Sequence, residues 1–124
     1  MRLVEFIGPP GCGKTTTLLR ARAIRKGRSF LTFEDAGLAE VSPEVDAPLL
    51  DIAKAAVLES SESEDVIGRR IGGVAVELSR ARRVAAIPGN DIVLTDECLG
   101  NWGLSLALCA GARRDLVRQY FQEM

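Results

Sequence analysis

A glycine-rich loop followed directly by lysine and threonine constrains this chain of 124 residues more than any other feature. The pattern Gly-x-x-x-x-Gly-Lys-Thr runs from Gly8 to Thr15. Glycines let backbone N–H groups converge on an anion, and the helix after such a loop presents its positive N-terminal end. Lys14 is then expected to contact the outer phosphates, and Thr15 to bind Mg²⁺. The predicted phosphate-binding residues are Gly8, Gly11, Cys12, Gly13, Lys14, Thr15 and Thr16.

Apolar runs that alternate with helical patterns predict an α/β fold. Short apolar runs predict strands at residues 3–7, 29–33 and 91–97. Apolar residues at helical spacing predict helices at residues 14–26, 49–57, 66–81 and 112–123, and Gly27 is expected to end the first of them. Residues 100–111 are ambiguous, and the polar residues 59–64 read as a connector. We expect residues 1–124 to form a single domain, a three-layer α/β/α sandwich with a small, mostly parallel sheet.

The charge balance and the apolar runs limit the partners that we expect. Sixteen basic against 17 acidic side chains give a net charge of −1, so no overall positive field attracts nucleic acid or an anionic membrane. The apolar run at residues 3–7 is too short for a signal peptide, and no later run approaches a membrane span. A cytoplasmic location is therefore expected. The chain has no histidine, which excludes a histidine-based catalytic or metal site.

Acidic residues follow two of the predicted strands. Asp96 and Glu97 end the strand at residues 91–97, and the carboxyl ends of parallel strands meet at one edge of a sheet. Residues 92–97 resemble the second signature of P-loop NTPases, in which a strand carries an Asp toward Mg²⁺. The resemblance implies that Asp96 holds Mg²⁺ through water and that Glu97 lies beside the outermost phosphate. Asp35 follows the strand at residues 29–33 and is expected either at this same edge or in an ordinary acidic turn. Either Asp35 or Glu97 would serve as the base, and the sequence does not choose between them.

Arginines cluster in the long helical pattern in the second half of the chain. Planar guanidinium groups can clamp a phosphate or carboxylate, although such residues more often form a solvated helix face. The residues concerned are Arg69, Arg70, Arg80, Arg82 and Arg83. Trp102, the single tryptophan, is expected to be a packing residue.

Two blocks of the chain carry a resemblance to a known group of proteins. Residues 4–17, VEFIGPPGCGKTTT, resemble the opening of small P-loop kinases and kinase-like ATP-binding proteins related to nucleotide and shikimate kinases, and the TDECLGNWGLSLAL segment is similar to their second, acidic motif. Only the first block is highly specific. The resemblance implies an ATP-dependent kinase or ATPase that uses Mg²⁺ and a small-molecule or nucleotide acceptor. It also implies phosphate, metal and catalytic roles for Lys14, Thr15, Asp96, Glu97 and Asp35.

The chain also departs from the pattern of these kinases, and the departures leave other functions open. Kinases of this type continue with two more strands and an arginine-rich lid, so we expect either an N-terminal fragment or a minimal nucleotide-binding module, with a sheet edge that favours self-association. The opening GPPGCGKTTTL is equally similar to the first motif of superfamily-one helicases. A motor of that class needs a basic groove with aromatic platforms for single-stranded nucleic acid. One Trp, one Tyr and four Phe in an acidic chain do not predict such a groove.

Strand order distinguishes these alternatives. In the kinase-like arrangement the strand that ends at Asp96 pairs directly with the strand that ends at Ile7, whereas helicase-type domains place another strand between them. A catalytically weak nucleotide-binding module is the third alternative.

Overall fold

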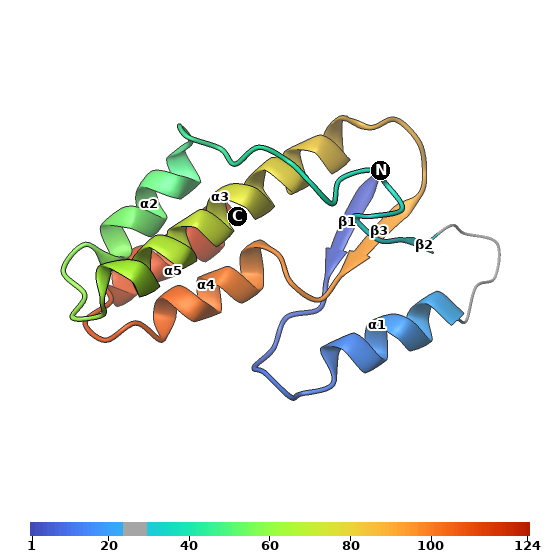
Figure 1. The fold of residues 1–124 in the computed structure, drawn as a ribbon. Coiled ribbons are helices and arrows are strands. Elements are labelled where there is room, and N and C mark those ends of the chain that lie inside the picture. The colour runs from blue at the N-terminus through green and yellow to red at the C-terminus, as the bar shows by residue number, and fades with distance from the viewer. Residues whose placement is uncertain (24–29) are drawn as a thin grey trace.

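The computed structural model describes residues 1–23 and 30–124 and shows a mixed α/β fold (Figure 1). In chain order the described elements are β1 (Arg2–Glu5), α1 (Lys14–Ala23), β2 (Phe30–Leu31), α2 (Pro48–Val57), α3 (Glu64–Ala86), β3 (Ile92–Thr95), α4 (Leu99–Ala107) and α5 (Arg114–Glu123). The predicted α/β class is confirmed. The expected helix end at Gly27 and strand start at Ser29 lie outside the described residues.

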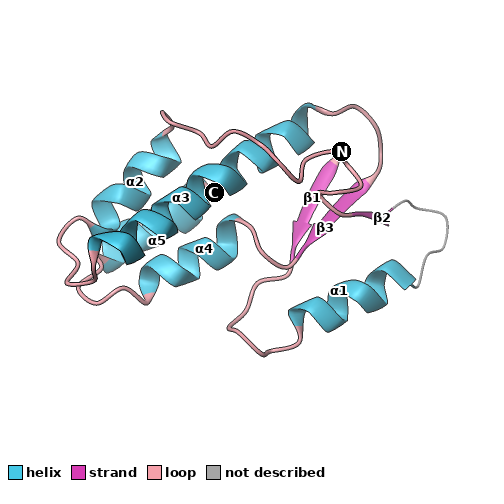
Figure 2. Ribbon diagram, viewed as in Figure 1, coloured by secondary structure: helices cyan, strands magenta, loops and turns pink. Residues whose placement is uncertain are grey.

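The three strands form a small sheet in the order β1-β3-β2, with both strand pairs parallel (Figure 2). Leu3 is in register with Val93, and Phe30 is in register with Ile92. The central strand β3 is the most buried, and Val93 has no exposed surface, which explains why the strand is apolar from Ile92 to Leu94. β1 pairs directly with β3, so the loop after β1 and Asp96 after β3 leave the sheet at the same edge.

Most of the hydrophobic core lies among α2, α3, α4 and α5, which pack against one another. The fully buried side chains of this group include Ala53, Val74, Leu106 and Tyr120, and the Tyr120 hydroxyl donates a hydrogen bond to the Leu99 carbonyl at 2.8 Å. A second, smaller cluster of Leu38, Val84 and Val93 packs at the sheet. α1 lies apart from the four-helix group (Figure 1). The strands are two to four residues long, so the helices bury most of the apolar surface.

The long helix α3 begins two residues before the predicted start at residue 66 and continues past the predicted end at residue 81. The Ser63 hydroxyl accepts a hydrogen bond from the Val66 N–H at 3.3 Å, and Glu64 lies in the first turn. The helix ends at Ala86, just before Pro88 and Gly89. None of the helices among residues 1–23 and 30–124 combines the length and apolar character needed to cross a bilayer.

Trp102 packs across α3, as predicted for this residue. Its ring lies against Gly73, because a Cβ added to Gly73 would come within 2.3 Å of the ring atom Cε2. The absence of a side chain at Gly73 therefore lets α3 and α4 approach closely. α4 occupies most of the segment that the sequence pattern left ambiguous.

The edge strand β1 supports a prediction about association. Its described partner is β3 alone, and Val4 and the following Ile7 keep 42% and 48% of their surface exposed. An unpaired edge with apolar side chains favours edge-to-edge pairing. We expect sedimentation velocity to show concentration-dependent self-association, and we expect Val4→Lys to weaken it because a charge on an edge strand opposes such pairing. A monomer of the unaltered chain at high concentration would contradict this prediction.

Candidate functional site

The predicted phosphate loop connects the end of β1 to the first residue of α1. Gly11 and Gly13 have φ angles of 79° and 92°, in the left-handed region that residues with a Cβ rarely adopt. α1 begins at Lys14, so its free N–H groups and the positive end of its dipole face the loop. The local backbone therefore has the features that an anion-binding loop requires.

Lys14 lies across the inside of this loop. Its ammonium donates hydrogen bonds to the carbonyl oxygens of Gly8, at 2.5 Å, and Pro9, at 3.4 Å. The side chain is thus held over the loop, where a phosphate group would meet its charge.

Thr15 and Asp96 are the two residues predicted to hold Mg²⁺, and the fold brings them together. They are 81 positions apart in the chain, yet the Thr15 hydroxyl donates a hydrogen bond to Asp96 Oδ2. One hydroxyl and one carboxylate suit Mg²⁺, which prefers oxygen ligands and usually keeps waters or phosphate oxygens in its remaining positions. Among the described residues, no cluster of three acidic, Cys or His side chains is present to hold a metal without such additional ligands.

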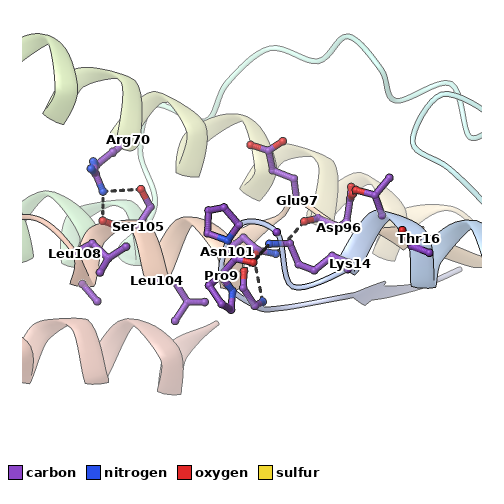
Figure 3. A pocket seen from close by; sticks show the side chains of 16 residues that line it. Pro9, Lys14, Thr16, Arg70, Asp96, Glu97, Asn101, Leu104, Ser105 and Leu108 are labelled. Atoms are coloured by element: carbon purple, nitrogen blue, oxygen red, sulfur yellow. Dashed lines mark hydrogen bonds between the residues drawn. The ribbon is translucent and has the colours of Figure 1, made fainter.

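A cavity of about 910 Å³ extends from the phosphate loop along α4 to α3 (Figure 3). Lys14 and Asp96 lie at one end, Glu97 lies between, and Arg70 lies beside Ser105 at the other end. The remaining lining residues are Gly8, Pro9, Pro10, Gly11, Gly13, Thr15, Thr16, Asn101, Leu104, Ala107 and Leu108. Of the predicted phosphate-binding residues, Cys12 alone is absent from the lining.

Asp35 lies outside this cavity, whereas Glu97 lines it. The Asp35 carboxylate accepts a hydrogen bond from the Thr32 N–H at 2.9 Å and pairs with Arg22 at 3.2 Å. The Thr32 hydroxyl in turn accepts from the Asp35 N–H at 3.1 Å, which makes residues 32–35 a hydrogen-bonded turn. A catalytic role for Asp35 stays a prediction, and the geometry favours Glu97 as the acidic residue beside the loop.

A carboxylate on β1 joins the strand to the start of α4, and the sequence analysis did not identify it. Glu5 Oε1 accepts hydrogen bonds from the N–H groups of Cys98, at 2.8 Å, and Asn101, at 2.9 Å, while Oε2 accepts from the Gly100 N–H at 2.8 Å. These are the N–H groups of the N-cap residue Cys98 and of the first turn of α4, which has no side-chain cap of its own. A glutamate inside an otherwise apolar strand is the sequence signal for such a role.

Asn101 connects the three chain segments that meet at the site. Its side-chain oxygen accepts a hydrogen bond from the Gly8 N–H at 3.3 Å. Its side-chain nitrogen donates to Glu5 Oε1 at 2.7 Å, to the Phe6 carbonyl at 3.0 Å and to the Asp96 carbonyl at 3.1 Å. The side chain therefore fixes the start of the phosphate loop relative to the residue expected to hold the metal.

The arginines that the sequence groups together lie in different environments in the fold. Arg80 pairs with Glu77 at 2.5 Å and lies 5.2 Å from the centre of the Phe33 ring, and Arg82 pairs with Glu44 at 3.1 Å. Only Arg70 of the five lines the cavity. An oxyanion clamp built from several of these arginines is therefore not assembled at this cavity.

Cys12 provides a chemical test of loop occupancy. Its thiol is exposed, whereas Cys98 and Cys109 are buried, and burial raises the pKa of Cys98 to about 12 and raises the pKa of Cys109. Only a thiolate reacts readily. We expect iodoacetamide to alkylate Cys12 at least about tenfold faster than the other two cysteines, and we expect Mg²⁺ with ATP to slow this reaction. Mass spectrometry of the peptides measures both rates. A Cys12 rate that nucleotide does not change would show that the thiol points away from the phosphates, and it would contradict this prediction.

Comparison of the chain with protein-family models, with curated proteins and with solved structures gave no match.

Proposed function

We propose that this chain is a P-loop nucleotide-binding domain of the three-layer α/β/α type that binds ATP with Mg²⁺ and transfers the γ-phosphoryl group to a small-molecule acceptor. One observation carries the proposal: the hydroxyl of Thr15, at the start of α1, is hydrogen-bonded to the carboxylate of Asp96, at the end of β3. The two residues belong to separate motifs of the sequence, and each motif predicts a metal ligand.

The residues of the cavity supply the parts that phosphoryl transfer needs. The loop N–H groups and the Lys14 ammonium would neutralise the phosphates, while Thr15 and Asp96 would hold Mg²⁺, which would offset part of the phosphate charge. Glu97 is exposed to the cavity and would accept the proton of the acceptor hydroxyl. The acceptor oxygen would then bond to the γ-phosphorus as the bond to the β–γ bridging oxygen breaks, and ADP would leave with those electrons.

Sheet topology and charge favour this function over a nucleic-acid motor. β1 pairs directly with β3, which is the arrangement expected for the kinase-like alternative. The net charge of −1 offers no overall attraction to a polyanion. The third alternative, a non-catalytic nucleotide-binding module, would share the phosphate loop and differ only in the lack of transfer.

Calorimetric titration with ATP and GTP, each with and without Mg²⁺, tests the proposal. We expect ATP binding that strengthens with Mg²⁺, and we expect Asp96→Asn to remove most of that strengthening. Asp91→Asn is the matched control, because Asp91 precedes the same strand at its opposite end. Absence of nucleotide binding would overturn the proposal, and binding with neither hydrolysis nor phosphorylation of any acceptor would leave the non-catalytic module.

A further inference from the structure

The end of the cavity beyond Glu97 is not used by the phosphate and metal roles described above. It is formed by Arg70 of α3 and by Leu104, Ser105 and Leu108 on or just after α4. Arg70 Nη1 donates hydrogen bonds to the Ser105 carbonyl oxygen and, at 2.7 Å, to the Ser105 hydroxyl. These bonds hold the half-buried guanidinium at the cavity wall.

Arg70 keeps unused capacity to bind an anion. Both of its hydrogen bonds involve Nη1, and across residues 1–23 and 30–124 no bond from Nε or Nη2 and no carboxylate partner is found. A guanidinium group presents five N–H donors in a planar fork that matches the two oxygens of a carboxylate or phosphate. The other exposed or half-buried arginines that form ion pairs, such as Arg82 with Glu44, lie away from the cavity.

The order of charges along the cavity indicates two separate anionic groups. Lys14 and Arg70 are the cationic residues of the lining. Asp96 lies at the Lys14 end, and the acidic Glu97 lies between the two cations. A volume of about 910 Å³ is near the upper end of the range for small-molecule sites, and it leaves space beside a nucleotide triphosphate group. Leu104 and Leu108 give the Arg70 end an apolar wall.

We propose that the Arg70 end of the cavity binds the carboxylate or phosphate of a second small molecule with an apolar body. Its role as the phosphoryl acceptor, with its hydroxyl directed toward Glu97, rests on the proposed function. Arg70 would fix the acceptor by its oxyanion, while Leu104 and Leu108 would contact its apolar part.

Benzoate and phenyl phosphate are suitable probes, because they present a planar and a tetrahedral oxyanion on the same apolar ring. Each would be titrated into the full chain saturated with Mg²⁺ and a non-hydrolysable ATP analogue. Calorimetry would measure affinity, and NMR would follow the methyl groups of Leu104 and Leu108. We expect at least one probe to bind and to shift these methyl signals, and the stronger of the two identifies the preferred oxyanion.

Variants at Arg70 and at the adjacent Arg69 test whether probe binding depends on the Arg70 guanidinium or only on positive charge nearby. We expect Arg70→Gln to weaken binding of the preferred probe at least about tenfold, because it removes a charge-assisted fork. Arg70→Lys should restore part of the affinity. Arg69→Gln is the matched control, because Arg69 is exposed on the same helix and does not line the cavity. If circular dichroism shows that Arg70→Gln is unfolded, the methyl shifts of the unaltered chain decide whether the probe binds at the Arg70 end of the cavity.

Three outcomes would overturn the inference: neither probe binds, the methyl shifts map elsewhere, or the ATP analogue displaces the probe, which would place it in the phosphate loop. The variant Lys14→Ala distinguishes failure of the Arg70 site from failure of the proposed nucleotide site. That variant should lose the nucleotide and keep the probe. If the unaltered chain binds a probe through Arg70 but no nucleotide, the oxyanion site stands and the acceptor role falls.

Discussion

Lys14→Ala is expected to abolish binding of Mg²⁺-ATP while the domain stays folded. The ammonium supplies charge to the phosphates, and a charge-assisted hydrogen bond contributes about 1.5–3 kcal/mol. Since Lys14 would contact more than one phosphate oxygen, we expect affinity to fall at least about 100-fold, with 1.4 kcal/mol for each factor of ten. Stability should change by no more than about 0.5 kcal/mol, because the side chain's partners are loop carbonyls.

Calorimetry with ATP and thermal unfolding of the same sample would measure both effects. Lys54→Ala is the matched control, because Lys54 is an exposed lysine of α2 that does not line the cavity. Unchanged ATP affinity in the Lys14 variant would refute the assignment of the phosphate loop.

Glu5→Ala should cause a large loss of stability. Its carboxylate accepts hydrogen bonds from three backbone N–H groups at the start of α4, that of the N-cap Cys98 among them, and from the Asn101 side-chain amide. Without it, partly buried donors lose their acceptor, which costs about 1–3 kcal/mol for each group that water does not reach. We expect the free energy of unfolding to fall by about 2–4 kcal/mol, as measured by urea denaturation.

Glu5→Gln gives a graded version of the same test. Its single side-chain oxygen can replace Oε1, which accepts three of the bonds, but its NH₂ group would then face the Gly100 N–H. The loss should therefore be smaller than for Ala. Glu40→Ala, at an exposed site, should change stability by less than about 0.5 kcal/mol. Equal stability of Glu5→Ala and Glu40→Ala would contradict the capping role.

The features that depend on local sequence were predictable. The loop between β1 and α1 needs glycines at Gly11 and Gly13, where φ is positive, and β3 is mostly apolar because it lies between two other strands. The meeting of Thr15 and Asp96 followed from a general property of parallel sheets, whose strand ends share one edge. These predictions used periodicity, loop composition, the direction of strands and the resemblance of two motifs to those of P-loop NTPases.

The features that depend on distant partners were not predictable. α4 has two glycines, which lower its helix propensity, and its start is capped by Glu5, more than 90 positions away in the chain. Asn101 carries no motif, because its function in the fold comes entirely from where Gly8, Phe6 and Asp96 meet. Arg70 could not be distinguished from Arg80 by sequence, since only packing decides which arginine faces the cavity.

The separate position of α1 affects how occupancy of the site can be detected. This helix carries Lys14 and Thr15, but Leu18 is its single buried side chain and it lies apart from the four-helix group. Opening α1 alone exposes little apolar surface, so its amide hydrogens should exchange with solvent much faster than those of α4. A ligand that joins the loop to Asp96 would stabilise the closed form by mass action. The rate of amide hydrogen exchange in α1 would then depend on ligand concentration, and it would do so independently of the stability of the rest of the domain.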